Sequence, residues 1–276
     1  MIETLKHYIS VLLYNYKLEI KREMEYISYS LMWFVMIPVS ALSGYYVLKV
    51  ILDQSGTING WNLGQIAFLY GLSLFSHGFQ DLLFIQTRHI DSAILMGEFD
   101  RALLRPMDVF FQFITSTFNL CGFSSLLPAV VVFGYGCYLL DFEWSFGNIL
   151  SVLMIIVGGT MISFAIFTLT GSIAFWTKKS SFLVSLDLTI IDKMTSYPMT
   201  IYPKLLTGIF TFIVPVGFIS FYPACGLLQM DTGLEYSFPI PVELPIVCLG
   251  IGIITFIIAK KFFMFALKRK YESAGS

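Results

Sequence analysis

The distribution of basic residues constrains the fold of this chain more than any other feature. Long uncharged apolar runs alternate with short connections, and every second connection lacks Lys and Arg entirely. Six spans account for this pattern, at about 27–48 and 63–85 and within 108–141, 143–178, 204–231 and 243–260. A bilayer core about 30 Å thick requires roughly 20 apolar residues in a helix, so runs of this length can cross a membrane. The sequence therefore predicts an all-α polytopic membrane protein with six transmembrane helices.

The connections divide by charge onto two sides of the predicted membrane. Those at 52–62, 139–148 and 230–243 share one side and contain no basic residue. All of the 17 Lys and Arg residues except Lys49 fall on the opposite side, which includes the whole segment from Lys178 to Lys204. By the positive-inside rule, this distribution predicts that both termini are cytoplasmic.

Composition excludes several classes of function. A chain that is 57% hydrophobic and 13% charged does not have the balance of a soluble domain. No basic segment is long or dense enough to follow a phosphate backbone, so we expect no nucleic-acid partner. The lipid bilayer is the expected environment.

The first 24 residues differ from the spans because they carry many charges. Their apolar positions recur at helical spacing, at Leu5, Tyr8, Ile9, Leu12, Tyr16 and Ile20. We predict an amphipathic helix over 1–24 that lies along the inner membrane surface. The alternative is a cytoplasmic helix packed on protein.

Few residues suggest chemistry. The chain has no Gly-x-x-x-x-Gly-Lys-Ser/Thr loop, no Ser/His/Asp arrangement and no metal-ligand spacing, so we expect no catalytic residue, metal or cofactor in it. His77 and Asp81 lie one helical turn apart near the cytoplasmic end of the second span and form a candidate intramembrane polar pair. Such a pair serves either as a structural anchor or in transport, for example as a proton relay.

The cytoplasmic segment 87–108 has the pattern of a docking element. It contains two short apolar stripes at helical spacing, namely Ile90, Ala93 and Ile94, then Phe99, Ala102 and Leu103. Gly97 permits a bend between them and Pro106 ends the second. Glu98 and Arg101 are spaced for an ion pair. This pattern favours a surface for a soluble partner, and a solvated linker that is amphipathic by chance is the alternative.

Two further features concern helix packing. Pro215 removes a backbone donor in the middle of the predicted fifth span, so a kink is expected there, and Phe221-Tyr222-Pro223 should break the helix near the outer surface. Pro215, Phe221, Tyr222 and Pro223 are therefore candidates for the transport path and its gate, with a purely structural bend as the alternative.

On the fourth span, small residues permit close helix approach, at a dimer interface or within the chain: Gly158, Gly159, Ser163 and Gly171.

Two motifs, in this order, resemble the signatures of a group of bacterial ABC-2 type ABC transporter permeases. The first is Gly97-Glu-Phe-Asp-Arg-Ala-Leu-Leu-Arg-Pro106. The second is Ile201-Tyr-Pro-Lys-Leu-Leu, followed by Phe212-Ile-Val-Pro-Val-Gly-Phe-Ile-Ser-Phe-Tyr-Pro-Ala224. The resemblance covers essentially the whole chain, which it identifies as a single transmembrane domain over 1–276.

The resemblance implies a permease subunit whose ATPase is a separate chain. It implies that this chain has a cytoplasmic coupling helix, which seats in a groove on that ATPase. The residues of this coupling helix would be Gly97, Glu98, Phe99, Asp100, Arg101, Leu104, Arg105 and Pro106. Short re-entrant helices after the fifth span would help to close an outer gate, which matches 221–241.

Several expectations about assembly follow from this resemblance. Two ATPase chains would bind ATP and magnesium, and a second permease, identical or paralogous, would complete a dimer in the bacterial plasma membrane. The apolar spans favour export of an amphipathic or hydrophobic substrate, such as a drug, a peptide or a lipid-like molecule. The alternatives are an ion-coupled secondary transporter and a non-transporting membrane scaffold or immunity protein.

Overall fold

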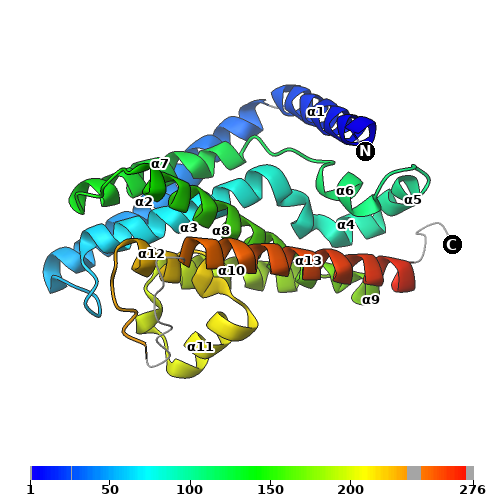
Figure 1. Ribbon diagram of the computed structural model, residues 1–276. Helices are drawn as coiled ribbons and strands as arrows, with labels where there is room; N and C mark the ends of the chain where they lie inside the picture. The colour runs from blue at the N-terminus through cyan, green and yellow to red at the C-terminus, as the bar shows by residue number, and fades with distance from the viewer. Residues whose placement is uncertain (1, 26, 235–243, 272–276) are drawn as a thin grey trace.

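The predicted all-α class is confirmed by a computed structural model that describes residues 2–25, 27–234 and 244–271; these residues form helices and no strand. Six helices form the bundle in Figure 1: α2 (Ile27–Ser55), α3 (Leu63–Phe84), α7 (Gly122–Leu139), α8 (Phe146–Ser172), α10 (Ser181–Ser196) and α13 (Leu244–Lys270). The most extensive contacts join α3 to α7 and α8 to α13, while α2 packs on α7 at the edge.

Glycines allow these helices to approach closely. A Cβ at Gly136 of α7 would lie 2.5 Å from the backbone nitrogen of Phe68 in α3. A Cβ at Gly158 of α8 would lie 2.8 Å from the carbonyl oxygen of Cys248 in α13. The small residues of the fourth span therefore serve packing within the chain, because Gly159 and Gly171 likewise face α3 and the segment that follows it.

Length and apolarity identify four of the described helices as able to cross a membrane, within α2, α7, α8 continued by α9 (Ala174–Thr177), and α13; the count is five if the bent pair Lys204–Ile213 and Val216–Leu227 forms one span. The helix α3 is long enough at 22 residues but carries polar side chains, and α10 has only 16 residues. The count of six spans therefore stays a prediction. The predicted third span is shorter than its uncharged run, because a separate helix α6 (Val109–Ile114) forms before α7 begins.

The predicted fifth span at 204–231 does not form one straight helix, and the structure leaves two interpretations of it, a broken span and a re-entrant loop. The helix α11 (Lys204–Gly208) continues as a π-helical turn (Ile209–Ile213), and the chain then bends by 75° before η4 (Val216–Phe218) and α12 (Phe221–Leu227). The expected bend at Pro215 is present. However, Phe221, Tyr222 and Pro223 begin α12 rather than break a helix, since proline is tolerated in a first helical turn. Residues 235–241 of the predicted re-entrant segment lie outside the described residues.

The fifth long helix of the bundle is instead α10. It begins beside the segment 87–108 and packs along α3 and α8; in the 3₁₀ turn η2 (Met199–Ile201) that follows it, the Thr200 carbonyl accepts a hydrogen bond from Asn59 Nδ2 at 3.0 Å. Because Asn59 belongs to the connection between α2 and α3, Lys204 lies at the end of the bundle opposite to the one predicted. The sequence rule missed α10 because Asp187, Asp192 and Lys193 interrupt its apolar run.

The predicted N-terminal helix is present as α1 (Ile2–Glu25), which packs on the segment 108–120. Tyr8 OH accepts a hydrogen bond from Asp108 N at 3.2 Å, and Glu23 accepts one from Leu120 N at 3.2 Å. The opposite face of α1 exposes Ile9, Leu13, Tyr14 and Leu18. One face of α1 thus packs on protein, and the position of its other face on the inner membrane surface stays a prediction.

Candidate transport cavity and coupling segment

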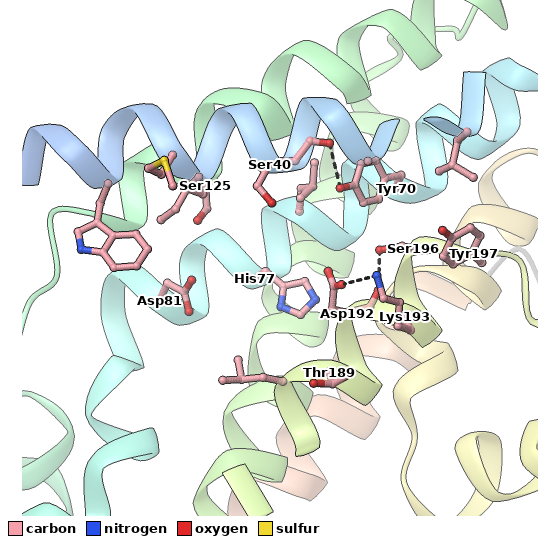
Figure 2. A pocket seen from close by; sticks show the side chains of 18 of the residues that line it. Ser40, Tyr70, His77, Asp81, Ser125, Thr189, Asp192, Lys193, Ser196 and Tyr197 are labelled. Atoms are coloured by element: carbon pink, nitrogen blue, oxygen red, sulfur yellow. Dashed lines mark hydrogen bonds and ion pairs between the residues drawn. The ribbon is translucent and has the colours of Figure 1, made fainter. Parts of the chain in front are cut away.

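A cavity of about 760 Å³ opens between α2, α3 and α10. Its two walls differ in chemistry. The α2 wall is mostly apolar and contains Trp33, Met36, Ile37, Ala41 and Leu48. The α3 and α10 wall is polar and includes Tyr70, His77, Asp81, Thr189, Asp192, Lys193 and Ser196. Figure 2 shows His77 and Asp81 on one helix and Asp192 on the other, facing the same space.

The predicted polar pair is brought into this cavity, but each member has a different partner. His77 Nε2 lies 3.3 Å from Thr195 Oγ1 of α10. Asp81 forms an ion pair with Arg88, which follows α3 in the 3₁₀ turn η1 (Ile85–His89). His77 therefore ties α3 to α10, whereas Asp81 is neutralised from its own side of the cavity.

Arg88 is the counterion of this wall, and its side chain is only 12% exposed. Its guanidinium also donates to Gln80 Oε1 and lies 4.5 Å from the centre of the Phe167 ring. A buried charge requires such partners, because an unpaired ion in a low-dielectric environment is costly. Arg88 was not among the predicted site residues. Its spacing was a usable signal, because Arg88 follows Asp81 by seven residues, which is about two helical turns.

Asp192 and Lys193 add a second pair of opposite charges, 3.4 Å apart and more exposed to the cavity than the first. These residues were missed because α10 was assigned to a cytoplasmic connection. α10 thus brings two charged side chains to the wall of the cavity. Among the described residues, no group of three His, Cys, Asp or Glu side chains could hold a metal ion.

The segment 87–108 forms two short helices, as its pattern predicts. α4 (Ile90–Leu95) and α5 (Glu98–Leu103) are joined at Gly97, whose φ of 65° is in the left-handed region that favours glycine. The segment lies at the end of the bundle where α8 and α13 finish, as Figure 1 shows.

The two apolar stripes of this segment mostly face the bundle. Phe99 is 0% exposed and packs against Phe113, Phe175, Phe263 and Tyr271. These side chains belong to a second apolar core, formed by α4, α5 and α6 with the ends of α8 and α13. The expectation that Phe99 lies on a docking surface is therefore wrong, because its ring is buried in this core.

A different set of apolar side chains is exposed on the same segment. Leu95 and Met96 precede Gly97, and Leu103 and Leu104 end the second helix; Leu104 is 87% exposed. We call these four residues the exposed patch. Glu98, Arg101 and Arg105 lie beside it, lining a small cavity between the segment and α1. The motif Gly97–Pro106 thus has a buried face and an exposed face.

Two polar contacts fasten this segment to α13. Tyr271 OH donates to Asp100 Oδ1 at 2.9 Å, and Lys260 Nζ lies 3.0 Å from Asp108 Oδ2. Burial, together with the hydrogen bond to Asp100, raises the pKa of Tyr271 to about 12. The phenol therefore stays protonated at physiological pH and remains a donor.

The predicted gate residues lie in the bent segment at the opposite end. Phe221, Tyr222 and Pro223 are buried, and Tyr222 is 2% exposed within the main apolar core. Tyr222 OH lies 2.7 Å from Thr211 Oγ1 in the π-helical turn, so one hydrogen bond joins the two arms of the bend. Tyr222 is thus a core residue, contrary to the expectation of a ring that only fills a gate.

A helical bundle with a partly polar cavity, and with two short helices covering one of its ends, is compatible with the membrane subunit of a transporter. Residues 39–275 match the family described as ABC-2 family transporter protein. The chain belongs to this family and is a permease subunit of an ABC transporter, which confirms the resemblance of its two motifs. No curated protein and no solved structure matches the chain significantly.

Proposed function

We propose that this chain is the membrane subunit of a bacterial ATP-driven exporter of amphipathic molecules. Two separate ATPase chains would bind ATP and magnesium, and a second permease, identical or paralogous, would complete the assembly in the plasma membrane. Family membership supports the general class. The cavity is the observation that carries the substrate class, because its apolar α2 wall and polar α3–α10 wall fit a molecule with an apolar body and a polar head.

The exposed patch is the proposed docking surface for the ATPase. It offers Leu95, Met96, Leu103 and Leu104 beside Arg101 and Arg105, which is the combination of apolar centre and charged rim typical of protein interfaces. With this patch in the cytoplasm, both chain termini are also cytoplasmic. The buried Phe99 then serves a supporting role, since it fixes α5 on the end of the bundle.

Copurification tests the class of protein. An ATPase encoded beside this chain should copurify with it from membranes, and ATP hydrolysis should drive export of a fluorescent amphiphile from cells or its uptake into inverted vesicles. Transport that persists without ATP but follows a proton or sodium gradient would indicate a secondary transporter. Neither bound ATPase nor transport would indicate a scaffold or an immunity protein.

A pair of variants tests the cavity as the transport path. Asp192→Asn changes a charge on the polar wall and should alter the transport rate several-fold while the ATPase stays bound. Asp53→Asn makes the same change on an exposed position outside the cavity and should have no effect. Equal transport rates in both variants would place the path elsewhere.

A further inference from the structure

A single buried carboxylate links the docking segment to the helix that lines the cavity. Asp91, in α4, is 7% exposed. Its Oδ2 atom accepts hydrogen bonds from Ser180 N at 3.3 Å and Ser181 N at 3.0 Å, at the start of α10. Its Oδ1 atom accepts from Ser92 N at 2.8 Å within α4. Both carboxylate oxygens are thus used, one in each helix.

The start of α10 has no side-chain cap of its own. The Ser180 side chain makes no capping bond to the helix, and its backbone has φ −128° and ψ −3° rather than the extended conformation usual at this position. The first backbone N–H groups of a helix have no partner inside the helix and carry partial positive charge. Asp91 supplies the missing acceptor and a full negative charge from a different helix.

This link connects the proposed docking surface for the ATPase with the proposed transport cavity. α4 ends at Leu95, which belongs to the exposed patch. At the far end of α10, Thr195 contacts His77 in the cavity wall and its carbonyl accepts from Ser220 Oγ at 2.8 Å. Ser220 immediately precedes α12. A movement of α4 that carries Asp91 would therefore displace α10, with consequences for the cavity and the bent segment.

We infer that Asp91 is the positioning residue through which movement of the docked ATPase reaches α10 and the cavity. This inference rests on the proposed function. It assigns the residue no contact with substrate or nucleotide. A buried hydrogen-bonded connection between a docking element and a cavity-lining helix is a physical route by which such coupling can travel.

The test uses the permease copurified with its ATPase in lipid nanodiscs. T189C places a spin label at an exposed α10 position that lines the cavity, in a C121S background because the other three cysteines are buried. Label mobility is compared without nucleotide and with ATP plus vanadate. In the labelled parent we expect ATP to change this mobility. With D91A added, we expect ATP hydrolysis within about twofold of the parent and an ATP-dependent mobility change at least fivefold smaller.

Two further variants separate coupling from simple helix stabilisation. S180D gives α10 a carboxylate at its own first position, so D91A/S180D should regain the thermal stability of the parent but not the ATP-dependent mobility change. Recovery of that change would show that Asp91 only caps α10 and would overturn the inference. D187A is the control, because it removes a carboxylate of α10 itself, and this variant should keep the ATP-dependent mobility change. A loss in D187A equal to that in D91A would also overturn the inference.

The outcome for the parent complex is read separately. If no ATPase copurifies with the parent, the proposed function fails and the inference fails with it. If the parent responds to ATP and D91A responds equally, the proposed function stands and only the role of Asp91 is rejected.

Discussion

Burial divides the residues of the Gly97–Pro106 motif into two groups with different consequences. Phe99 has four aromatic neighbours in the second apolar core, whereas Leu104 is almost fully exposed. Both are large apolar residues five positions apart, so residue type alone does not reveal which of them is buried. Variants at the two positions should therefore fail in different assays.

Truncation of Phe99 should cost stability. Removal of a fully buried phenyl ring typically destabilises a protein by about 3–5 kcal/mol through lost burial and the cavity left behind. We expect Phe99→Ala to lower the thermal unfolding midpoint of the detergent-solubilised permease clearly. Leu104→Ala, at an exposed position, should stay within about 0.5 kcal/mol of the parent. Equal midpoints for the two variants would contradict this assignment of the core.

Charge placed on the exposed patch should affect association instead. Leu104→Asp should leave the unfolding midpoint unchanged but weaken ATPase binding by about 2 kcal/mol or more, roughly thirtyfold, as expected for an interface anchor. The binding constant can be measured by titration of the solubilised permease with ATPase. Leu104→Met, which keeps an apolar side chain of similar size, should bind as the parent does. Normal binding by Leu104→Asp would remove the patch from the interface.

At the level of elements, a hydrogen bond between Tyr222 and Thr211 joins the two arms of the bent segment. Tyr222→Phe removes the hydroxyl that bonds Thr211 but keeps the ring in the core, and Thr211 Oγ1 still donates to Thr207 O at 2.7 Å. The change should cost only about 0.5–1.5 kcal/mol, so the assembly stays intact. We expect faster amide exchange over 204–213 and an altered transport rate. Unchanged exchange would show that the contact does not hold the arms together.

The elements also show what sequence could and could not reveal. Apolar runs predicted α2, α7, α8 and α13, because a lipid-facing helix is apolar around most of its surface. The same rule failed for α10, whose charges face a cavity rather than lipid. For 204–231, Pro215 indicated a bend, but neither the proline nor the length of the run could give its size of 75°. Charge inside the bundle is thus the common cause of both the missed helix and the missed site residues.

The site was predicted less completely than the fold, for a related reason. The pairing of His77 with Thr195, and of Asp91 with Ser180 and Ser181, joins residues about 90–120 positions apart. No local spacing encodes such contacts. Motif residues were found by pattern, but their side-chain directions depend on which helix packs against them. Phe99 and Tyr222 illustrate this, because both were placed at surfaces and both are buried.

At the level of the whole molecule, the path of α10 determines on which side of the membrane Lys204 lies. The positive-inside rule places Lys204 in the cytoplasm, whereas the hydrogen bond from Asn59 to Thr200 places this part of the chain beside the connection between α2 and α3. Together with Lys49, Lys204 would be the second exception among 17 basic residues. The packed helix should prevail, because the rule describes a tendency of short loops and the buried contacts of α10 are fixed by the fold.

Labelling of single cysteines in intact cells decides between these two topologies. Gly56, Ser145, Lys179 and Lys204 are all exposed in the structure, so accessibility to a membrane-impermeant maleimide depends on the side alone. We expect G56C, S145C and K204C to react from outside and K179C to react only after the cells are permeabilised. Reaction of K204C only after permeabilisation, together with outside labelling of G56C, would restore the cytoplasmic assignment and exclude α10 as a crossing. In that event the cavity between α2, α3 and α10 would not cross the membrane, and the transport path proposed here would fail with it.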